Sequence, residues 1–203
     1  MVRKLSMFVA IAAFVVTGWQ APASAKKVLG GKGKALVLAY IYHPAKKILA
    51  GSRKLSGEVK FGAKTGSTTA LSGSVNIPVK SLRSGNARRD NYMRNSLGIK
   101  ANPTISFAPK SITEKAQTVK KYSWKASKRK PVKCTHEIKG TFTINGKTQD
   151  VTVAAKVVNK GGKTRYIIPN LVLKVTDFGI VRPSLGPAKI KNEVHLRMLI
   201  TLE

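Results

Sequence analysis

The chain has 203 residues, and its 38 Lys and Arg against 8 Asp and Glu give a formal net charge of +30. A hydrophobic share of 42% is too high for a disordered basic tail and is sufficient for a packed core. One Cys excludes an internal disulfide framework and a cysteine-based zinc site, and the length allows one domain or two small ones.

The first 25 residues have the features of a secretory signal peptide. Arg3 and Lys4 form a positive n-region, and residues 7–16 are an apolar run that is too short to span a bilayer. Residues 23–25, Ala-Ser-Ala, then provide an A-x-A cleavage site. We therefore predict that residues 1–25 are removed and that the protein is exported, either to the periplasm or out of the cell. The loss of Arg3 and Lys4 would leave a net charge of +28.

After this leader we expect a flexible basic segment at residues 26–34 and a single domain at residues 35–203. Apolar and polar residues alternate through much of that domain, which predicts β-strands with one apolar face each. The pattern is clearest at residues 189–202, where Val194, Leu196 and Met198 share one face. We predict about eight strands, at residues 35–42, 54–61, 69–79, 103–108, 138–144, 147–158, 164–176 and 189–202, with a bend near Pro169.

One short helix is predicted at residues 86–98. Asn86 can cap its first turn, and Gly98 suits its end. The polar run from Asn86 through Arg88 and Arg89 to Asp90 could form a binding site. Such a run more often caps and pairs a helix, and we favour this structural interpretation.

Residues 138–158 carry the strongest local signal. They contain two alternating runs around the Asn-Gly dipeptide at 145–146, which is typical of a two-residue hairpin turn. A turn of this length places the apolar residues of both runs on one face of the hairpin. That face would carry Phe142, Ile144, Val151 and Val153.

A basic stretch at residues 120–133 holds seven Lys and Arg with Tyr122 and Trp124 between them. One interpretation is a solvated loop or an edge hairpin. The other is a patch that faces an anionic surface or a membrane, with the two aromatic side chains at the interface.

A sheet of about eight strands tends to close into a barrel or to fold into a sandwich, and the strand pattern alone leaves both open. The interior of an eight-stranded barrel is either filled by side chains or holds one ligand. The inward apolar residues would line it. The candidate ligand-binding residues are therefore Val75, Ile77, Phe107, Phe142, Ile144, Val151, Val153, Val194, Leu196 and Met198.

Four segments resemble motifs of the YceI-like family, in the same order. Residues 81–90, SLRSGNARRD, resemble S-L-x-T-G-N-x-x-R-D, and residues 102–107, NPTISF, are similar to Y-P-x-I-x-F. Residues 140–148, GTFTINGKT, resemble G-x-L-T-I-x-G-x-T, and residues 177–180, DFGI, match the end of R-x-D-F-G-I. The resemblance implies an eight-stranded antiparallel lipocalin-like barrel with one short helix. It also implies an exported protein of the cell envelope that holds a long isoprenoid or similar lipid in its interior.

Two functions follow as hypotheses. The first is the binding and carriage of an apolar lipid, which would be driven by removal of the lipid from water. The alternative is a basic adaptor that docks on anionic envelope polymers or a membrane surface, with the barrel as a scaffold. Because we predict export, we expect no physiological nucleic acid partner.

Catalysis finds no support in the sequence. It contains no G-x-S-x-G, H-E-x-x-H or P-loop motif, and its eight carboxylates are scattered. His43, His136 and His195 are far apart, so we expect no metal site and no cofactor. Cys134 has no partner for a catalytic set, and we interpret it as a bystander thiol or a site for an intermolecular bond.

Overall fold

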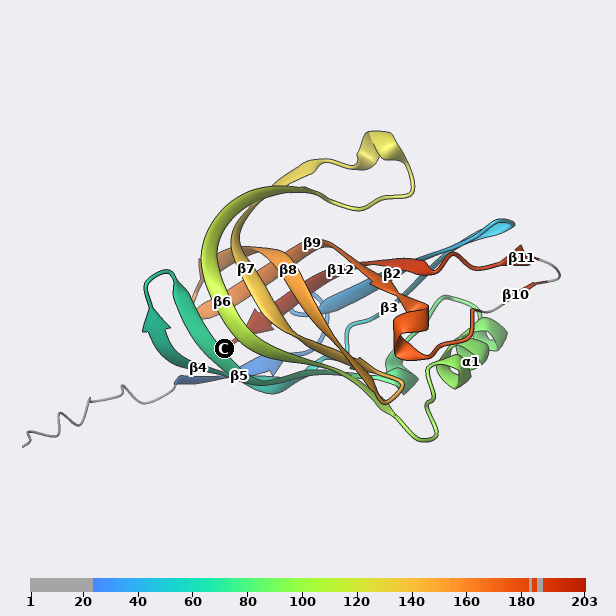
Figure 1. Cartoon of the computed structure of the whole chain (residues 1–203), viewed down its shortest axis with the longest axis horizontal. Helices are drawn as coiled ribbons and strands as arrows, with labels where there is room; N and C mark the ends of the chain where they lie inside the picture. The colour runs from blue at the N-terminus through green and yellow to red at the C-terminus, as the bar shows by residue number, and fades with distance from the viewer. Residues whose placement is uncertain (1–23, 183, 186–187) are drawn as a thin grey trace, which may run out of the picture.

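The computed structural model describes residues 24–182, 184–185 and 188–203 (Figure 1). Residues 1–23 of the predicted signal peptide lie outside these described residues. The one α-helix among them is α1 (Ala87–Ser96). The strands are β1 (Ser24–Leu29), β2 (Leu36–His43), β3 (Lys46–Ser52), β4 (Ser56–Thr65), β5 (Thr68–Pro78), β6 (Thr104–Lys120), β7 (Pro131–Ile144), β8 (Lys147–Lys160), β9 (Lys163–Lys174), β10 (Ser184–Leu185), β11 (Ala188–Lys189) and β12 (Glu193–Leu202).

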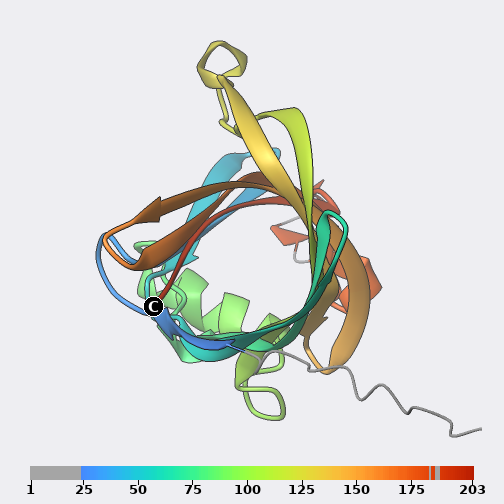
Figure 2. The same ribbon diagram turned by 90° about the vertical axis from the view of Figure 1, so that its left-hand side faces the viewer.

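Eight of these strands form a closed antiparallel ring, which is visible end-on in Figure 2. Strands pair in the order β1-β4-β5-β6-β7-β8-β9-β12, and an additional pairing between β1 and β12 closes the circle. The expected eight-stranded antiparallel barrel with one short helix is thereby confirmed. The sandwich that the strand pattern left open is excluded, because each ring strand hydrogen-bonds to two neighbours.

The barrel closes at β12, where two different strands pair with the same edge. Residues 194–199 of β12 pair with β2, whereas Thr201 and Leu202 pair with Leu29 and Val28 of β1. Strand β3 then follows β2, and its Gly51 bonds through both backbone groups to Arg83 beyond β5. The β2–β3 hairpin therefore extends the wall at one end of the barrel while β1 closes it at the other.

The structure corrects two predictions near the N-terminus. A flexible lead was expected at residues 26–34, but residues 24–29 form β1, which pairs with β4 and β12. Strand β3 was not predicted at all; it returns along β2 after the turn at Pro44. Neither strand has a clear alternating pattern. Strand β1 pairs with strands that are distant in sequence, and a tight turn brings β3 against β2.

The long β6–β7 hairpin reaches beyond the ring in both views (Figures 1 and 2). Strand β6 runs for 17 residues, far past the end predicted at residue 108. The basic stretch at 120–133 is the tip of this hairpin, which agrees with the interpretation as a loop or hairpin. Tyr122 and Trp124 of this stretch pack on Tyr40 of the barrel wall and remain only partly buried.

Two local features follow the sequence closely. Asn145 and Gly146 have φ values of 51° and 72°, the left-handed pair that a tight β7–β8 hairpin needs. In β9 the pairing with β12 shifts register between Ile168 and Leu171, which places a bulge at the predicted bend near Pro169. Proline suits this bulge because it has no N–H to donate to the ladder.

Helix α1 lies at one end of the barrel, at the right of Figure 1. Asn86 caps it as predicted: its side-chain oxygen accepts a hydrogen bond from the Arg89 N–H at 2.9 Å. Helix α1 has only ten residues, and in the described part of the chain no helix is long and apolar enough to cross a membrane.

Candidate functional site

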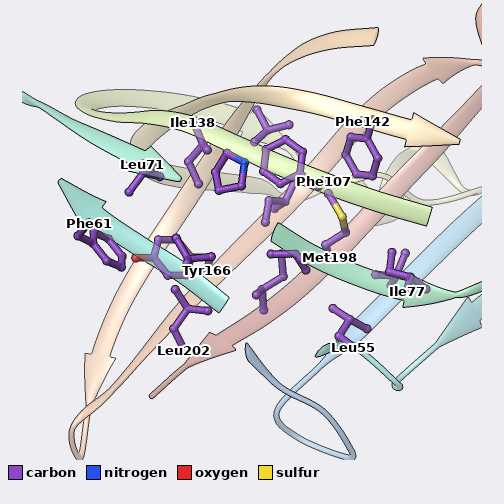
Figure 3. Close-up of a pocket in the computed structure, with 17 residues that line it drawn as sticks. Leu55, Phe61, Leu71, Ile77, Phe107, Ile138, Phe142, Tyr166, Met198 and Leu202 are labelled. Atoms are coloured by element: carbon purple, nitrogen blue, oxygen red, sulfur yellow. The ribbon is translucent and has the colours of Figure 1, made fainter. Parts of the chain in front are cut away.

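A first cavity lies inside the barrel toward the β4–β5 end, and we call it the first chamber (Figure 3). Its lining is apolar apart from the hydroxyl of Tyr166. Burial of Tyr166 raises the pKa of its phenol to about 12. The lining comes from seven ring strands, from β2 and from Leu55, which directly precedes β4: Val37, Leu55, Val59, Phe61, Leu71, Val75, Ile77, Phe107, Pro109, Ile138, Phe142, Val153, Tyr166, Ile168, Met198, Ile200 and Leu202.

A second cavity, the second chamber, lies toward the α1 end. Met93 of α1 and Leu97, the residue that caps the helix end, face it, because residues four apart share one side of a helix. Phe178 and Ile180, which follow β9, contribute to its lining as well. The remaining lining residues are Val37, Ala39, Ile41, Ala50, Ile77, Leu82, Ile105, Phe142, Ile144, Leu173, Val175, Val194, Leu196 and Met198.

The two chambers meet at a waist formed by the four residues that line both, namely Val37, Ile77, Phe142 and Met198. Phe142 is 2% exposed, and its ring centroid lies 5.1 Å from that of Phe107. Figure 3 shows Phe142 and Met198 on facing strands at this point. The interior is therefore two chambers in line rather than one open bore.

The cavity volumes are about 50 Å³ for the first chamber and about 130 Å³ for the second. Each exceeds the space that one water molecule needs, and each is smaller than a typical small-molecule pocket of about 300–1,000 Å³. A long guest would thus require lining side chains to change rotamer. Met198 is suited to this, because methionine is unbranched and adapts its shape.

The structure brings together nine of the ten predicted binding residues. Val151 is the exception: it packs on the core but lines neither chamber. The ring of Phe107 lies over Gly140, the partner of Val151 on β7, so the space beside Val151 is already occupied. The nine residues that line a chamber are Val75, Ile77, Phe107, Phe142, Ile144, Val153, Val194, Leu196 and Met198.

Sequence reasoning missed the residues that end the two chambers. Tyr166 and Phe61 lie in strands that were predicted, but their side chains were not assigned to the interior. Met93 and Leu97 were missed because α1 is polar overall; their spacing of four residues was the available signal. Phe178 stands in the DFGI segment, where it was noted only as part of a motif.

The polar run before and within α1 is a structural cluster. Asp90 is 3% exposed and accepts hydrogen bonds from the backbone N–H of Ser84, at 2.7 Å, and from the Ser84 hydroxyl. Arg94 lies 3.7 Å from its second oxygen. Burial opposes ionisation, but these hydrogen bonds and the positive charges of Arg94 and Arg83 outweigh it, so the pKa of Asp90 lies below its usual value. The cluster joins the start of α1 to the chain after β5.

The histidines and the cysteine lie apart from the chambers. Within the described residues no group of three or more His, Cys, Asp and Glu could hold a metal ion. His43 is buried and bonds through Nε2 to the Ala188 carbonyl at 3.1 Å and through Nδ1 to the Ala45 N–H at 3.1 Å. Cys134 is 2% exposed, and burial raises the pKa of its thiol.

Comparison with known proteins agrees with this architecture. A family model described as a YceI-like domain matches residues 38–202, so the chain belongs to the YceI-like family. The chain is similar to the UPF0312 protein of Pseudomonas aeruginosa (strain LESB58), with 26% identity over 204 residues that cover 97% of this chain and 96% of the relative.

Two solved structures share the fold. Burkholderia cenocepacia BcnA aligns with a TM-score of 0.62 and 19% identity, covering 82% of this chain and 95% of that one. A structure described as a polyisoprenoid binding domain from Saccharophagus degradans, implicated in plant cell wall breakdown, aligns with a TM-score of 0.59 and 10% identity. That alignment covers 89% of this chain and 98% of the other.

Proposed function

We propose that this protein binds one long, flexible apolar lipid, of the isoprenoid kind, along its barrel axis. The observation that carries the proposal is the apolar lining that continues from the first chamber through the waist into the second. The fold shared with a polyisoprenoid binding domain supports it. Binding would be driven by transfer of the lipid from water to this lining.

The shape of the interior favours a thin chain over a rigid ring system. A chain can pass the waist after rotamer changes at Met198 and Phe142, whereas a fused-ring lipid would need the strands themselves to move apart. The lining also favours binding over catalysis. Among the described residues that line the chambers, Tyr166 carries the one titratable group, and catalysis by general acid and base needs groups poised near the working pH.

The proposal is tested with the full chain and polyprenols of increasing length, with binding measured by native mass spectrometry. Val153→Trp would fill the first chamber and should lower the affinity for long polyprenols by at least about tenfold. Thr152→Trp adds the same ring at the exposed neighbouring position on β8 and should leave binding unchanged. Equal binding by both variants, with both folded by circular dichroism, would show that the lipid does not occupy the barrel.

We further propose that the protein acts in the cell envelope after removal of residues 1–25. The n-region, apolar run and A-x-A site support this. Cleavage after Ala25 would remove two residues of β1 but keep the pairs of Val28 and Leu29 with β12. N-terminal sequencing of protein from the periplasmic fraction should begin at Lys26; intact Met1 in the cytosol would contradict export.

A second candidate function is docking on an anionic envelope polymer or membrane surface. Residues 125–130 at the tip of the β6–β7 hairpin are all exposed, and four of them are basic. Replacement of Lys125, Lys128 and Lys130 by Glu should weaken binding to anionic vesicles, and salt should weaken binding of the unaltered protein. Vesicle binding that is insensitive to both changes would assign the hairpin tip another role.

A further inference from the structure

A cleft on the outside of the barrel lies between the β6–β7 hairpin tip and the wall, and we call it the outer cleft. Tyr40 and Tyr42 of β2 point outward into it, while their neighbours Ala39 and Ile41 line the second chamber. The hairpin is fixed over the wall by the Tyr122 N–H, which donates to the Pro169 carbonyl at 3.1 Å. The cleft volume is about 360 Å³, which is within the usual range for small-molecule pockets.

Aromatic rings hold the hairpin tip against the wall. The Tyr40 ring meets Tyr122 edge to face at 5.1 Å and Trp124 at 5.2 Å between centroids. Tyr122 also stacks on His195 of β12 at 3.7 Å, with the two rings only 10° from parallel. The Tyr40 hydroxyl accepts a hydrogen bond from Arg197 at 2.6 Å. The walls of the cleft are therefore largely aromatic and joined by ring contacts, with Tyr42, Tyr122 and Trp124 only partly buried.

Cationic groups line the same cleft. The Arg129 guanidinium lies 4.8 Å from the centroid of the Tyr122 ring, and the Lys191 ammonium lies 4.8 Å from that of Tyr42. Lys47 is the third cation, and Glu193 is the one carboxylate in the lining. Within the described residues none of these three cations forms an ion pair, whereas six of the eight carboxylates are paired with other Lys or Arg residues.

We propose that the outer cleft binds an acidic saccharide, a sugar ring that bears a phosphate or carboxylate group. The C–H face of a sugar ring can lie on the partly exposed aromatic surface of Tyr42 or Trp124. Its anionic group would then meet Arg129, Lys191 and Lys47, which donate charge-assisted hydrogen bonds. A purely apolar guest is disfavoured here, because it would take charged heads out of water without replacing their hydrogen bonds. The site lies outside the barrel, so its occupancy does not depend on lipid in the chambers.

Isothermal titration of the full chain with glucose 1-phosphate and with glucuronic acid tests the proposal. Both should bind more tightly than glucose, which lacks the anion, and than inorganic phosphate, which lacks the ring. The double variant Arg129→Gln/Lys191→Gln should lose about tenfold or more in affinity, because each contact to an anion is charge-assisted. The double variant Lys100→Gln/Lys139→Gln removes the same charge from exposed positions outside the cleft and should bind normally.

Further probes separate the ring from the anion. Tyr42→Leu keeps an apolar side chain but removes the flat face, and it should weaken the acidic sugars while leaving phosphate binding unchanged. The proposal would be overturned if phosphate bound as tightly as glucose 1-phosphate, or if both double variants lost the same affinity for the acidic sugars. It would also be overturned if a single-stranded oligonucleotide bound more tightly than either sugar in a way that depends on Arg129 and Lys191. Absence of binding by both acidic sugars at millimolar concentration would overturn it as well.

Discussion

The side-chain oxygen of Asn145 lies in the space that a Cβ on Gly98 would occupy. Asn145 stands at the tip of the β7–β8 hairpin, and Gly98 follows α1 with φ of +68°. The Asn145 Nδ2 group also donates to the Phe178 carbonyl at 3.2 Å. One side chain thus joins the hairpin tip, the end of α1 and the turn after β9, which together cover the second chamber.

Gly98→Ala should therefore destabilise the protein by more than about 1 kcal/mol, because it combines a left-handed φ with a steric clash. Gly85→Ala is the matched control. Its φ is +80°, but no atom lies within 4 Å of a Cβ there, so it reports the backbone cost alone. Urea unfolding of both variants measures the difference, and equal losses would show that Asn145 moves aside freely.

Phe142→Ala should cost about 3–5 kcal/mol of unfolding free energy, since the ring is almost fully buried at the waist. Tyr92→Ala provides the control, because the Tyr92 side chain on α1 is 57% exposed and its loss should have little effect on stability. Chemical denaturation measures both. A loss below about 1 kcal/mol for Phe142→Ala would mean that the waist collapses around the gap.

Asp90→Asn should lower stability by about 1.5–3 kcal/mol at neutral pH, because hydrogen bonds to a charged carboxylate are lost in a buried place. The pKa of Asp90 is lowered in the folded state, so its ionisation stabilises the protein above the unfolded pKa near 3.8. That contribution disappears as the pH falls through the folded pKa. The stability difference between wild type and Asp90→Asn should therefore shrink below about pH 4. A difference that stays constant down to pH 2 would contradict the lowered pKa.

Tyr166 should ionise late in an alkaline titration followed by ultraviolet absorbance. Burial raises its pKa to about 12 from 10, so the neutral phenol is favoured in the folded state. Its contribution to stability is complete below pH 10 and is lost as the pH rises toward 12. Tyr166→Phe should abolish this late step and should still bind lipid, because the ring that lines the first chamber is retained. An unchanged titration curve in the variant would contradict the assignment.

Strands whose faces differ in polarity were predictable from sequence, and others were not. Strand β12 and the β7–β8 hairpin alternate clearly, because one face meets the interior and the other meets solvent. Strand β1 is short and rich in Lys, and it becomes a strand only because β4 and β12 offer free edges. The outer half of β6, beyond residue 108, alternates weakly because much of it projects beyond the ring.

The candidate site was predicted as a set of inward residues but not as two chambers. Alternation shows which side of a strand faces inward, but the position along the barrel axis depends on register and stagger. The meeting of Phe142 with Ile77 and Met198 at the waist is therefore a property of the closed ring. The outer cleft was hidden for a similar reason, since Tyr122 and Tyr40 are 82 positions apart and meet only when the hairpin folds back.

The chain carries a single thiol, and the fold shields it almost completely on β7. Cys134 can react with an alkylating reagent only when that part of the wall opens, and its raised pKa slows the reaction further. The rate of labelling therefore reports how often the sheet opens locally around Cys134. The protein thus contains its own probe for comparing the empty and lipid-loaded barrel, with no engineered label.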